Sequence, residues 1–353
     1  MNKHQELLSA LVNIVNRENA SDIHLSEGRY PTIRVDGVLI PIQVGNLLTK
    51  EDLEGFLSIL LVNGQEEKFK KEKEFDFSIT IDNNRFRGNV FMQQTHISIV
   101  LRNIPGTVRT LEELSLPAIL ELFARKQQGF FLVVGPTGHG KSTTLTAIIE
   151  LINKNRNAHI LTIEDPIEYI YTQKKAIIDQ REVGIDTDSF EKAMKAMFRE
   201  DIDVVLIGEM RGKETMSTAV SAAETGHLVF STLHTNSASQ TIDRIIDTFA
   251  AEEQRQIRNQ LASSLIGIFS QRLIKSVSGG RVPAFELLIN NNAIANLIRE
   301  GRIAEIDSFI ETGMDQGMIS INRSLAELVK KGKITIEDAY AHSPRSQSLE
   351  KML

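Results

Sequence analysis

The sequence predicts an α/β protein in which a small α+β domain precedes a larger domain with a parallel sheet and a helical C-terminal region. Short segments with alternating apolar residues fill the first hundred positions. After residue 111, near-continuous apolar strands alternate with helices, which is typical of a parallel sheet covered on both faces. The segment GPTGHGKST at 135–143 follows one of these strands. We therefore expect a bound nucleotide at the end of that strand.

Residues 1–102 are predicted to form the first domain. The segment QELLSALVNIV, at 5–15, has the apolar spacing of a helix. Phe75, Phe77, Ile79 and Ile81 alternate ahead of the turn Asp82-Asn83-Asn84, and Ile97, Ile99 and Leu101 alternate after it. These patterns predict antiparallel hairpins. The segment NIPGTVRT, residues 103–110, is the expected linker or hinge, because it contains Pro105 and Gly106.

Residues 111–292 are predicted to form the nucleotide-binding domain and 293–353 a helical C-terminal region. The four expected strands read FFLVV, HILTI, VVLIG and HLVFSTL. A helical stripe of Ile321, Leu325, Leu328 and Val329 is expected to end at Gly332. Thr335 is the expected N-cap of a last short helix.

Composition narrows the functional class. The chain has 353 residues, a net charge of −6, no cysteine, no tryptophan and four tyrosines. A nucleic-acid partner is not expected, because such proteins usually have a basic face and stacking aromatic residues. No apolar run approaches the length of a membrane span, and the start MNKHQELLSA lacks the pattern of a signal peptide. We expect a cytoplasmic protein without an integral membrane segment.

The phosphate loop is the most informative motif. Gly135, Gly140, Lys141 and Ser142 fit G-x-x-x-x-G-K-[ST]. Glycines allow backbone N–H groups to point at phosphate oxygens, and the following helix N-terminus favours an anion. Lys141 is expected to reach the β- and γ-phosphates and Ser142 to bind Mg²⁺. The alternative is a chance match in a glycine-containing turn. The predicted binding segment comprises Gly135, Pro136, Thr137, Gly138, His139, Gly140, Lys141, Ser142 and Thr143.

Acidic and histidine residues follow or flank the other strands. Glu209 comes just after the strand VVLI, and Glu164 comes at the end of HILTI with Asp165 behind it. The ends of parallel strands meet at one edge of a sheet, so both acids are expected beside the phosphate loop. A surface or helix-capping acid is the alternative. His227 and His234 bracket one strand, seven residues apart; they are either structural histidines or sensors of the γ-phosphate.

Several long segments then carry a family resemblance. GPTGHGKST, TIEDPIEY, REDIDVVLIGEMR, AAETGHLVFSTLHTNSA and IDRIID, in this order, resemble the secretion-type ATPases that power type IV pili and type II secretion. The resemblance covers nearly the whole chain, including the early signature ASDIHL at 20–25. The short length, the absence of a four-cysteine module and the tail ANLIREGRIAEI resemble the retraction (twitching motility) branch. QREVGIDTDSFE and AYAHSPRSQSLEKML resemble the accessory retraction paralogue at least as well as the principal motor.

The resemblance implies a homo-hexameric ATPase ring at the inner-membrane base of the pilus. Each subunit is expected to have a PAS-like N-terminal domain and a RecA-like domain, with ATP and Mg²⁺ between them. The implied partners are the pilus platform protein and possibly a paralogous retraction ATPase. Lys141 and Ser142 match the Walker A ligands, and Glu209 matches the Walker B acid, which makes Ser142 and Glu209 the expected metal ligands. The remaining implied catalytic positions are Glu164, His227, His234, Arg87 and Arg102, with Arg85 nearby.

Four departures from the family pattern affect what is expected of turnover. An arginine that is common after the strand holding Phe91 is absent, and Gln94 and Thr95 stand there. Ile202 replaces a usual proline, Ala295 replaces a tail arginine, and His139 occupies a loop position that is often small. The alternative to a self-sufficient motor is therefore a nucleotide-binding subunit that assists one.

Overall fold

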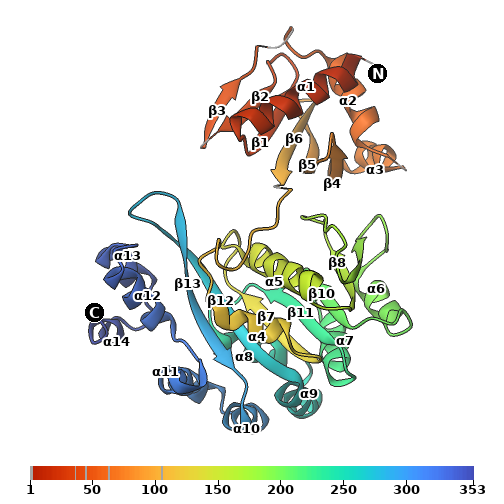
Figure 1. Cartoon of the computed structure of the whole chain (residues 1–353). Coiled ribbons are helices and arrows are strands. Elements are labelled where there is room, and N and C mark those ends of the chain that lie inside the picture. Colours follow the sequence, from red (N-terminus) through yellow and green to blue (C-terminus); the bar gives the residue numbers. More distant parts are fainter. Residues whose placement is uncertain (1–2, 36, 44–45, 63, 105) are drawn as a thin grey trace. The chain divides into compact units, whose positions relative to one another are not determined.

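The computed structural model describes residues 3–35, 37–43, 46–62, 64–104 and 106–353 (Figure 1). The chain divides into two compact units, one of residues 1–107 with 166–170 and the other of residues 108–165 with 171–353. Pro105 of the predicted linker lies outside the described residues. None of the helices in the described ranges is long and apolar enough to cross a membrane.

The first unit contains an antiparallel sheet with the strand order β3-β2-β1-β6-β5-β4. Its strands are β1 (Asp22–Ser26), β2 (Thr32–Val35), β3 (Val38–Pro41), β4 (Glu74–Ile81), β5 (Asn84–Gln93) and β6 (His96–Ile104). Its helices are α1 (Lys3–Glu18), α2 (Lys50–Leu60) and α3 (Gln65–Glu72). The helix predicted at 5–15 and the predicted hairpins are confirmed.

One face of this sheet is apolar and the other is polar, because side chains alternate along each strand. Ile23, Leu101 and Phe86 are fully buried and belong to a core that includes the stripe of α1, with Leu11 and Val15. The polar face carries a row of charged residues, in which Arg102 stands opposite both Asp22 and Arg87 in the strand register. The arginines expected at the nucleotide therefore project from the polar face.

Both predicted hairpins close through two residues in the left-handed region. Asp82 and Asn83 have φ values of 48° and 65°, and Gln94 and Thr95 have 47° and 68°. Two consecutive positive φ values indicate a type I′ turn, which matches the twist of the strands. Asn and Asp adopt this conformation readily, whereas a β-branched threonine is strained in it.

The second unit is built on a seven-stranded sheet with the order β13-β12-β7-β11-β10-β8-β9. All neighbouring strands are parallel except β12 and β13. The strands are β7 (Gly129–Val134), β8 (His159–Glu164), β9 (Ile177–Glu182), β10 (Val204–Ile207), β11 (Leu228–Leu233), β12 (Leu265–Lys275) and β13 (Arg281–Ile289). The four predicted strands correspond to β7, β8, β10 and β11.

Helices cover both faces of this sheet, as the continuous apolar strands predicted. One core joins the sheet to α6 through α11, and a second joins the other face to α4 and α5. The helices are α4 (Glu121–Ala124), α5 (Lys141–Asn155), α6 (Phe190–Met197), α7 (Lys213–Glu224), α8 (Ala238–Asp247), α9 (Ala251–Ser264), α10 (Asn292–Glu300) and α11 (Ile306–Thr312). Short 3₁₀ turns are η1 (Ala118–Leu120), η2 (Ile303–Glu305) and η3 (Gly313–Gln316).

The last helices form a small layer on the β12–β13 hairpin. They are α12 (Ile321–Lys330), α13 (Ile336–His342) and α14 (Ser346–Glu350), which gather beside β13 in Figure 1. Their apolar core includes Ile274 and Ala284 from the hairpin and Leu325 and Leu349 from the helices. The Thr335 hydroxyl accepts a hydrogen bond from the Asp338 backbone N–H, which confirms the predicted N-cap. By contrast, Ala295 in α10 is buried in the main core.

Candidate functional site

The parallel sheet brings most of the predicted site residues to one edge. The phosphate loop follows β7, His234 follows β11, Glu209 follows β10 after one glycine, and Glu164 ends β8. These four strands are adjacent in the order β7, β11, β10, β8, and all run in the same direction. Their carboxyl ends therefore meet, which is where ligands bind in open α/β sheets.

The loop from Gly135 to Gly140 has a backbone that requires glycine. Gly135, Gly138 and Gly140 have φ values of 143°, 77° and 83°. A Cβ atom on Gly135 would lie 2.3 Å from the carbonyl oxygen of Gln271. The loop is thus curled against β12, and it leads directly into α5, a helix of 15 residues whose N-terminus favours an anion.

Lys141 lies inside the curl of this loop. Its side chain is buried, and its Nζ donates hydrogen bonds to the carbonyl oxygens of Gly135 (2.8 Å) and Pro136 (3.0 Å). The same atom lies 3.3 Å from Nδ1 of His234. Ser142, the next residue, is exposed at the start of α5. A cation enclosed by a loop of this shape is suited to contact phosphate oxygens.

His234 connects the phosphate loop with Glu209. Its Nδ1 lies 3.2 Å from the Thr137 hydroxyl, and its Nε2 lies 3.3 Å from Oε1 of Glu209. The other carboxylate oxygen of Glu209 accepts a hydrogen bond of 3.1 Å from Arg211, and this bond raises the pKa of the guanidinium. One imidazole ring thus contacts both the loop and the acid that follows β10.

Glu164 lies at the end of the strand next to β10. Its carboxylate accepts a 2.7 Å hydrogen bond from the Thr162 hydroxyl. The N–H of Gly208 donates to the carbonyl of Ile163 at 2.8 Å, and a Cβ on Gly208 would lie 3.5 Å from the Glu164 Cα. Gly208 therefore brings the backbones that carry Glu164 and Glu209 close together.

His227 precedes β11 at its amino end, whereas the phosphate loop, His234 and Glu209 lie at the carboxyl ends of the strands. Its carbonyl accepts a hydrogen bond from the N–H of Gly129 at the start of β7, and its Nδ1 lies 3.1 Å from the Ala222 carbonyl. Its ring packs edge-to-face on Phe198 at 5.6 Å. The six residues of β11 separate it from His234, which is about 20 Å at the usual rise of a strand. The two histidines are not brought together within this chain.

The three predicted arginines belong to the first unit. Nε of Arg102 lies 3.0 Å from Asp22, and 71% of its side chain is exposed. Arg85 donates to Ser78, and Arg87 is exposed. Burial disfavours the charge of Asp22, but hydrogen bonds from Ser21 and Arg102 outweigh this and lower its pKa. Asp22 therefore stays ionised and orients the Arg102 guanidinium.

The residues of the site offer oxygen ligands for a magnesium ion. No group of three or more His, Cys, Asp or Glu within the described ranges gathers closely enough to hold a metal. Mg²⁺ needs no such cage, because it usually takes one or two protein oxygens together with phosphate oxygens and water. The exposed Ser142 hydroxyl and the Glu209 carboxylate are donors of this type.

Two residues that hold the loop were not predicted from the sequence. The buried side chain of Gln271, in β12, bonds to Thr144 and to the carbonyl of His139, and Arg281 donates to the carbonyl of Gly138 at 3.2 Å. Both residues lie on the β12–β13 hairpin, and neither has a recognisable motif around it. Only the pairing of β12 beside β7 places them at the loop.

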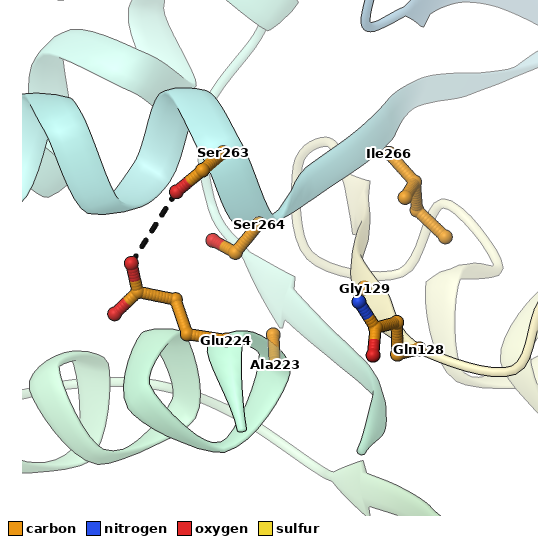
Figure 2. Close-up of a pocket in the computed structure, with 7 residues that line it drawn as sticks. All are labelled: Gln128, Gly129, Ala223, Glu224, Ser263, Ser264 and Ile266. Atoms are coloured by element: carbon orange, nitrogen blue, oxygen red, sulfur yellow. Dashed lines mark hydrogen bonds between the residues drawn. The ribbon is translucent and has the colours of Figure 1, made fainter. Parts of the chain in front are cut away.

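A separate hollow of about 290 Å³ lies near the start of β7 (Figure 2). Its wall includes Gly129, Glu224 and Ser263, and Figure 2 shows Glu224 and Ser263 pointing toward each other. The Ser263 hydroxyl donates to Glu224 at 3.3 Å. None of the seven residues drawn around it belongs to the predicted site.

Comparison with known proteins identifies the family of this chain. The family model for type II/IV secretion system proteins matches residues 2–337. The chain is 45% identical to the type IV pilus retraction ATPase PilT of Pseudomonas aeruginosa over 324 residues, which are 92% of this chain and 94% of that protein. It is 40% identical to the type IV pilus ATPase PilU of the same organism, over 97% of this chain and 90% of that one.

A solved structure has the same fold. The crystal structure of the pilus retraction motor PilT with bound ADP superposes with a TM-score of 0.91 at 42% identity, covering 97% of this chain and 98% of that chain. The match includes both the N-terminal unit and the unit that carries the phosphate loop.

Proposed function

This chain belongs to the type II/IV secretion system protein family and is a P-loop ATPase that binds nucleotide, and we propose that it is a Mg²⁺-dependent motor for type IV pilus retraction. The observation that carries the proposal is the meeting of Lys141, His234 and Glu209 at one edge of the sheet. The similarity to PilT, over nearly the full length of both chains, supports pilus retraction as the work performed.

The roles of the site residues follow from their positions. Lys141 and the N–H groups of residues 135–143 hold the β- and γ-phosphates of ATP. Ser142 and Glu209 would hold Mg²⁺, which neutralises charge on the phosphates when it is bound. Glu164 and Glu209 orient the attacking water. His234 contacts both the loop and Glu209, so it senses whether the γ-phosphate is present.

We further propose a homo-hexameric ring, in which the remaining predicted residues act. Arg87 and Arg102 are solvent-facing cations on the polar face of the first unit, and they supply positive charge to nucleotide held by a neighbouring subunit. His227, which lies far from its own phosphate loop, acts at the subunit interface. The domains are 1–102, 111–292 and 293–353, and residues 103–110 form the hinge that converts γ-phosphate loss into rotation.

The proposed location is the cytoplasmic side of the inner membrane, at the base of the pilus. The platform protein of the pilus is the proposed partner, and no nucleic acid is involved. The acidic net charge of −6 supports the last point.

A second candidate function is an accessory subunit that depends on a principal retraction ATPase. Its support is the 40% identity to PilU over 97% of this chain. The Gln94–Thr95 turn, at which the family commonly has an arginine, adds to that support.

Complementation distinguishes the two functions. A strain without retraction ATPases would receive the wild-type chain or Glu209→Gln, and twitching would be measured. A principal motor restores twitching alone, and the variant does not. Twitching above the level that PilT alone restores, seen only when PilT is also supplied, would favour the accessory subunit. Equal restoration by Glu209→Gln in the absence of PilT would contradict the proposed motor.

A further inference from the structure

Gln271 lies beneath the phosphate loop and uses both ends of its side-chain amide to hold it. The residue is 3% exposed. Its Oε1 accepts a 2.7 Å hydrogen bond from the hydroxyl of Thr144 in α5, and its Nε2 donates to the carbonyl of His139 at 2.9 Å. One amide therefore joins the turn before Lys141 to the first turn of the helix after it.

The backbone of Gln271 also shapes the start of the loop. Its carbonyl oxygen lies where a Cβ of Gly135 would be, at 2.3 Å. The chain passes this close only because residue 135 has no side chain. Gln271 thus contacts the loop at its first residue, at its fifth residue and just beyond its end.

A neighbour of Gln271 on the hairpin adds one further contact. The pairing of β12 with β7 ends at Ser270, which frees the N–H of Leu273 to donate to Nδ1 of His139 at 2.9 Å. Burial, together with the nearby Arg281, His342, Lys141 and Arg272, lowers the pKa of His139. The imidazole therefore stays neutral near pH 7, so Nδ1 remains an acceptor.

We propose that Gln271 is a positioning residue for nucleotide binding, which fixes the curvature of the phosphate loop without touching the phosphate. The loop must present its N–H groups in one arrangement. A loop that is already ordered loses less conformational entropy when the nucleotide binds. Loss of the amide would also leave the Thr144 hydroxyl and the His139 carbonyl without their buried partner. The inference rests on the phosphate loop as the nucleotide site and does not depend on the pilus.

The test measures ADP affinity with a fluorescent ADP analogue, and KM and kcat for ATP. Gln271→Leu removes both hydrogen bonds at similar volume and should raise the Kd by about tenfold or more, with a larger effect on KM than on kcat. Thr144→Val removes one bond and should raise the Kd by less. The double variant should be little worse than Gln271→Leu, because both changes break the same contact. Gln271→Glu keeps the acceptor for Thr144 but replaces the donor to the His139 carbonyl with a carboxylate oxygen, so it should not restore the affinity.

Asn153→Leu is the matched control, since Asn153 is a fully buried amide at the far end of α5. It should lower the melting temperature and leave the Kd unchanged. The proposal is overturned if a folded Gln271→Leu variant has wild-type affinity for ADP. It is also overturned if that variant loses no more affinity than Asn153→Leu does. If Gln271→Leu does not fold, an unchanged Kd in both Thr144→Val and Gln271→Glu overturns it. Lys141→Ala distinguishes a failure of this proposal from a failure of the nucleotide-site assignment. Normal ADP binding by that variant would refute the nucleotide site itself.

Discussion

Nε2 of His234 lies 3.3 Å from Oε1 of Glu209, and the other nitrogen of the same ring lies 3.3 Å from Nζ of Lys141. The ring therefore links the residue that follows β10 to the loop that follows β7. Under the proposed function, a change at the phosphates reaches Glu209 through this side chain. This relationship makes His234 the residue whose substitution separates nucleotide binding from hydrolysis.

Substitution of His234 by alanine should lower kcat by at least about tenfold while the Kd for ADP changes little, because the proposed phosphate contacts come from Lys141 and the loop N–H groups and not from this ring. His159→Ala is the control, since His159 starts β8 at the opposite edge and pairs with Asp179 at 2.9 Å. Steady-state kinetics give kcat, and nucleotide titration gives the Kd, for both variants. Equal kcat values for His234→Ala and wild type would refute the link.

Substitution of Lys141 by alanine should weaken ADP and ATP binding by about a hundredfold, since a buried cation facing the phosphates is lost. Isothermal titration calorimetry measures the affinity. The variant also loses the hydrogen bonds from Lys141 to the carbonyls of Gly135 and Pro136, which could destabilise the loop. The melting temperature without nucleotide is therefore measured in parallel. A folded variant that binds ADP as wild type does would place the nucleotide elsewhere.

Glu286 predicts a pH dependence of stability. Glu286 lies in β13 and accepts a 2.8 Å hydrogen bond from the N–H of Ala238 at the start of α8. Burial raises the pKa of this carboxyl from 4.5 to about 7, although the hydrogen bond acts to lower it. The folded state then binds the proton more tightly than the unfolded state, so Glu286 reduces stability as pH rises from about 4.5 through 7. The shift corresponds to about 3 kcal/mol.

Glu286→Gln keeps the acceptor for Ala238 and removes the titration. The variant should gain most relative to wild type above pH 7, and the difference should shrink toward pH 4.5. Denaturant unfolding at several pH values measures it. A difference that does not vary with pH would show that Glu286 does not titrate in this range.

The Gln94–Thr95 turn predicts a stabilising change. Both residues adopt positive φ in a type I′ turn, which favours Asn-Gly. Replacing the pair with Asn-Gly should raise the free energy of unfolding of the first unit by about 1 kcal/mol. Asn83→Gly, in the other hairpin, is the matched control and should gain less, because asparagine already tolerates this conformation. Loss of stability in the Asn-Gly variant would contradict the turn geometry.

Much of the fold and site was predictable from local pattern. The strands β7, β8, β10 and β11 are apolar enough to identify from the sequence, and the residues that follow them therefore meet at one edge. The contacts of Gln271 with the loop were not predictable, because β12 reaches the loop only through long-range pairing with β7. The separation of His227 from His234 was implicit in the sequence, since residues at the two ends of one strand lie at opposite edges of a sheet.

The proposed function requires a self-sufficient, Mg²⁺-dependent ATPase whose turnover depends on Glu209. Steady-state ATP hydrolysis by the purified chain, with Mg²⁺ or with EDTA, tests it most directly when Glu209→Gln is measured in parallel. We predict turnover that requires Mg²⁺ and falls by at least about a hundredfold in the variant, which still binds ADP. Nucleotide binding without turnover by the wild-type chain, or wild-type turnover by Glu209→Gln, would contradict the claim.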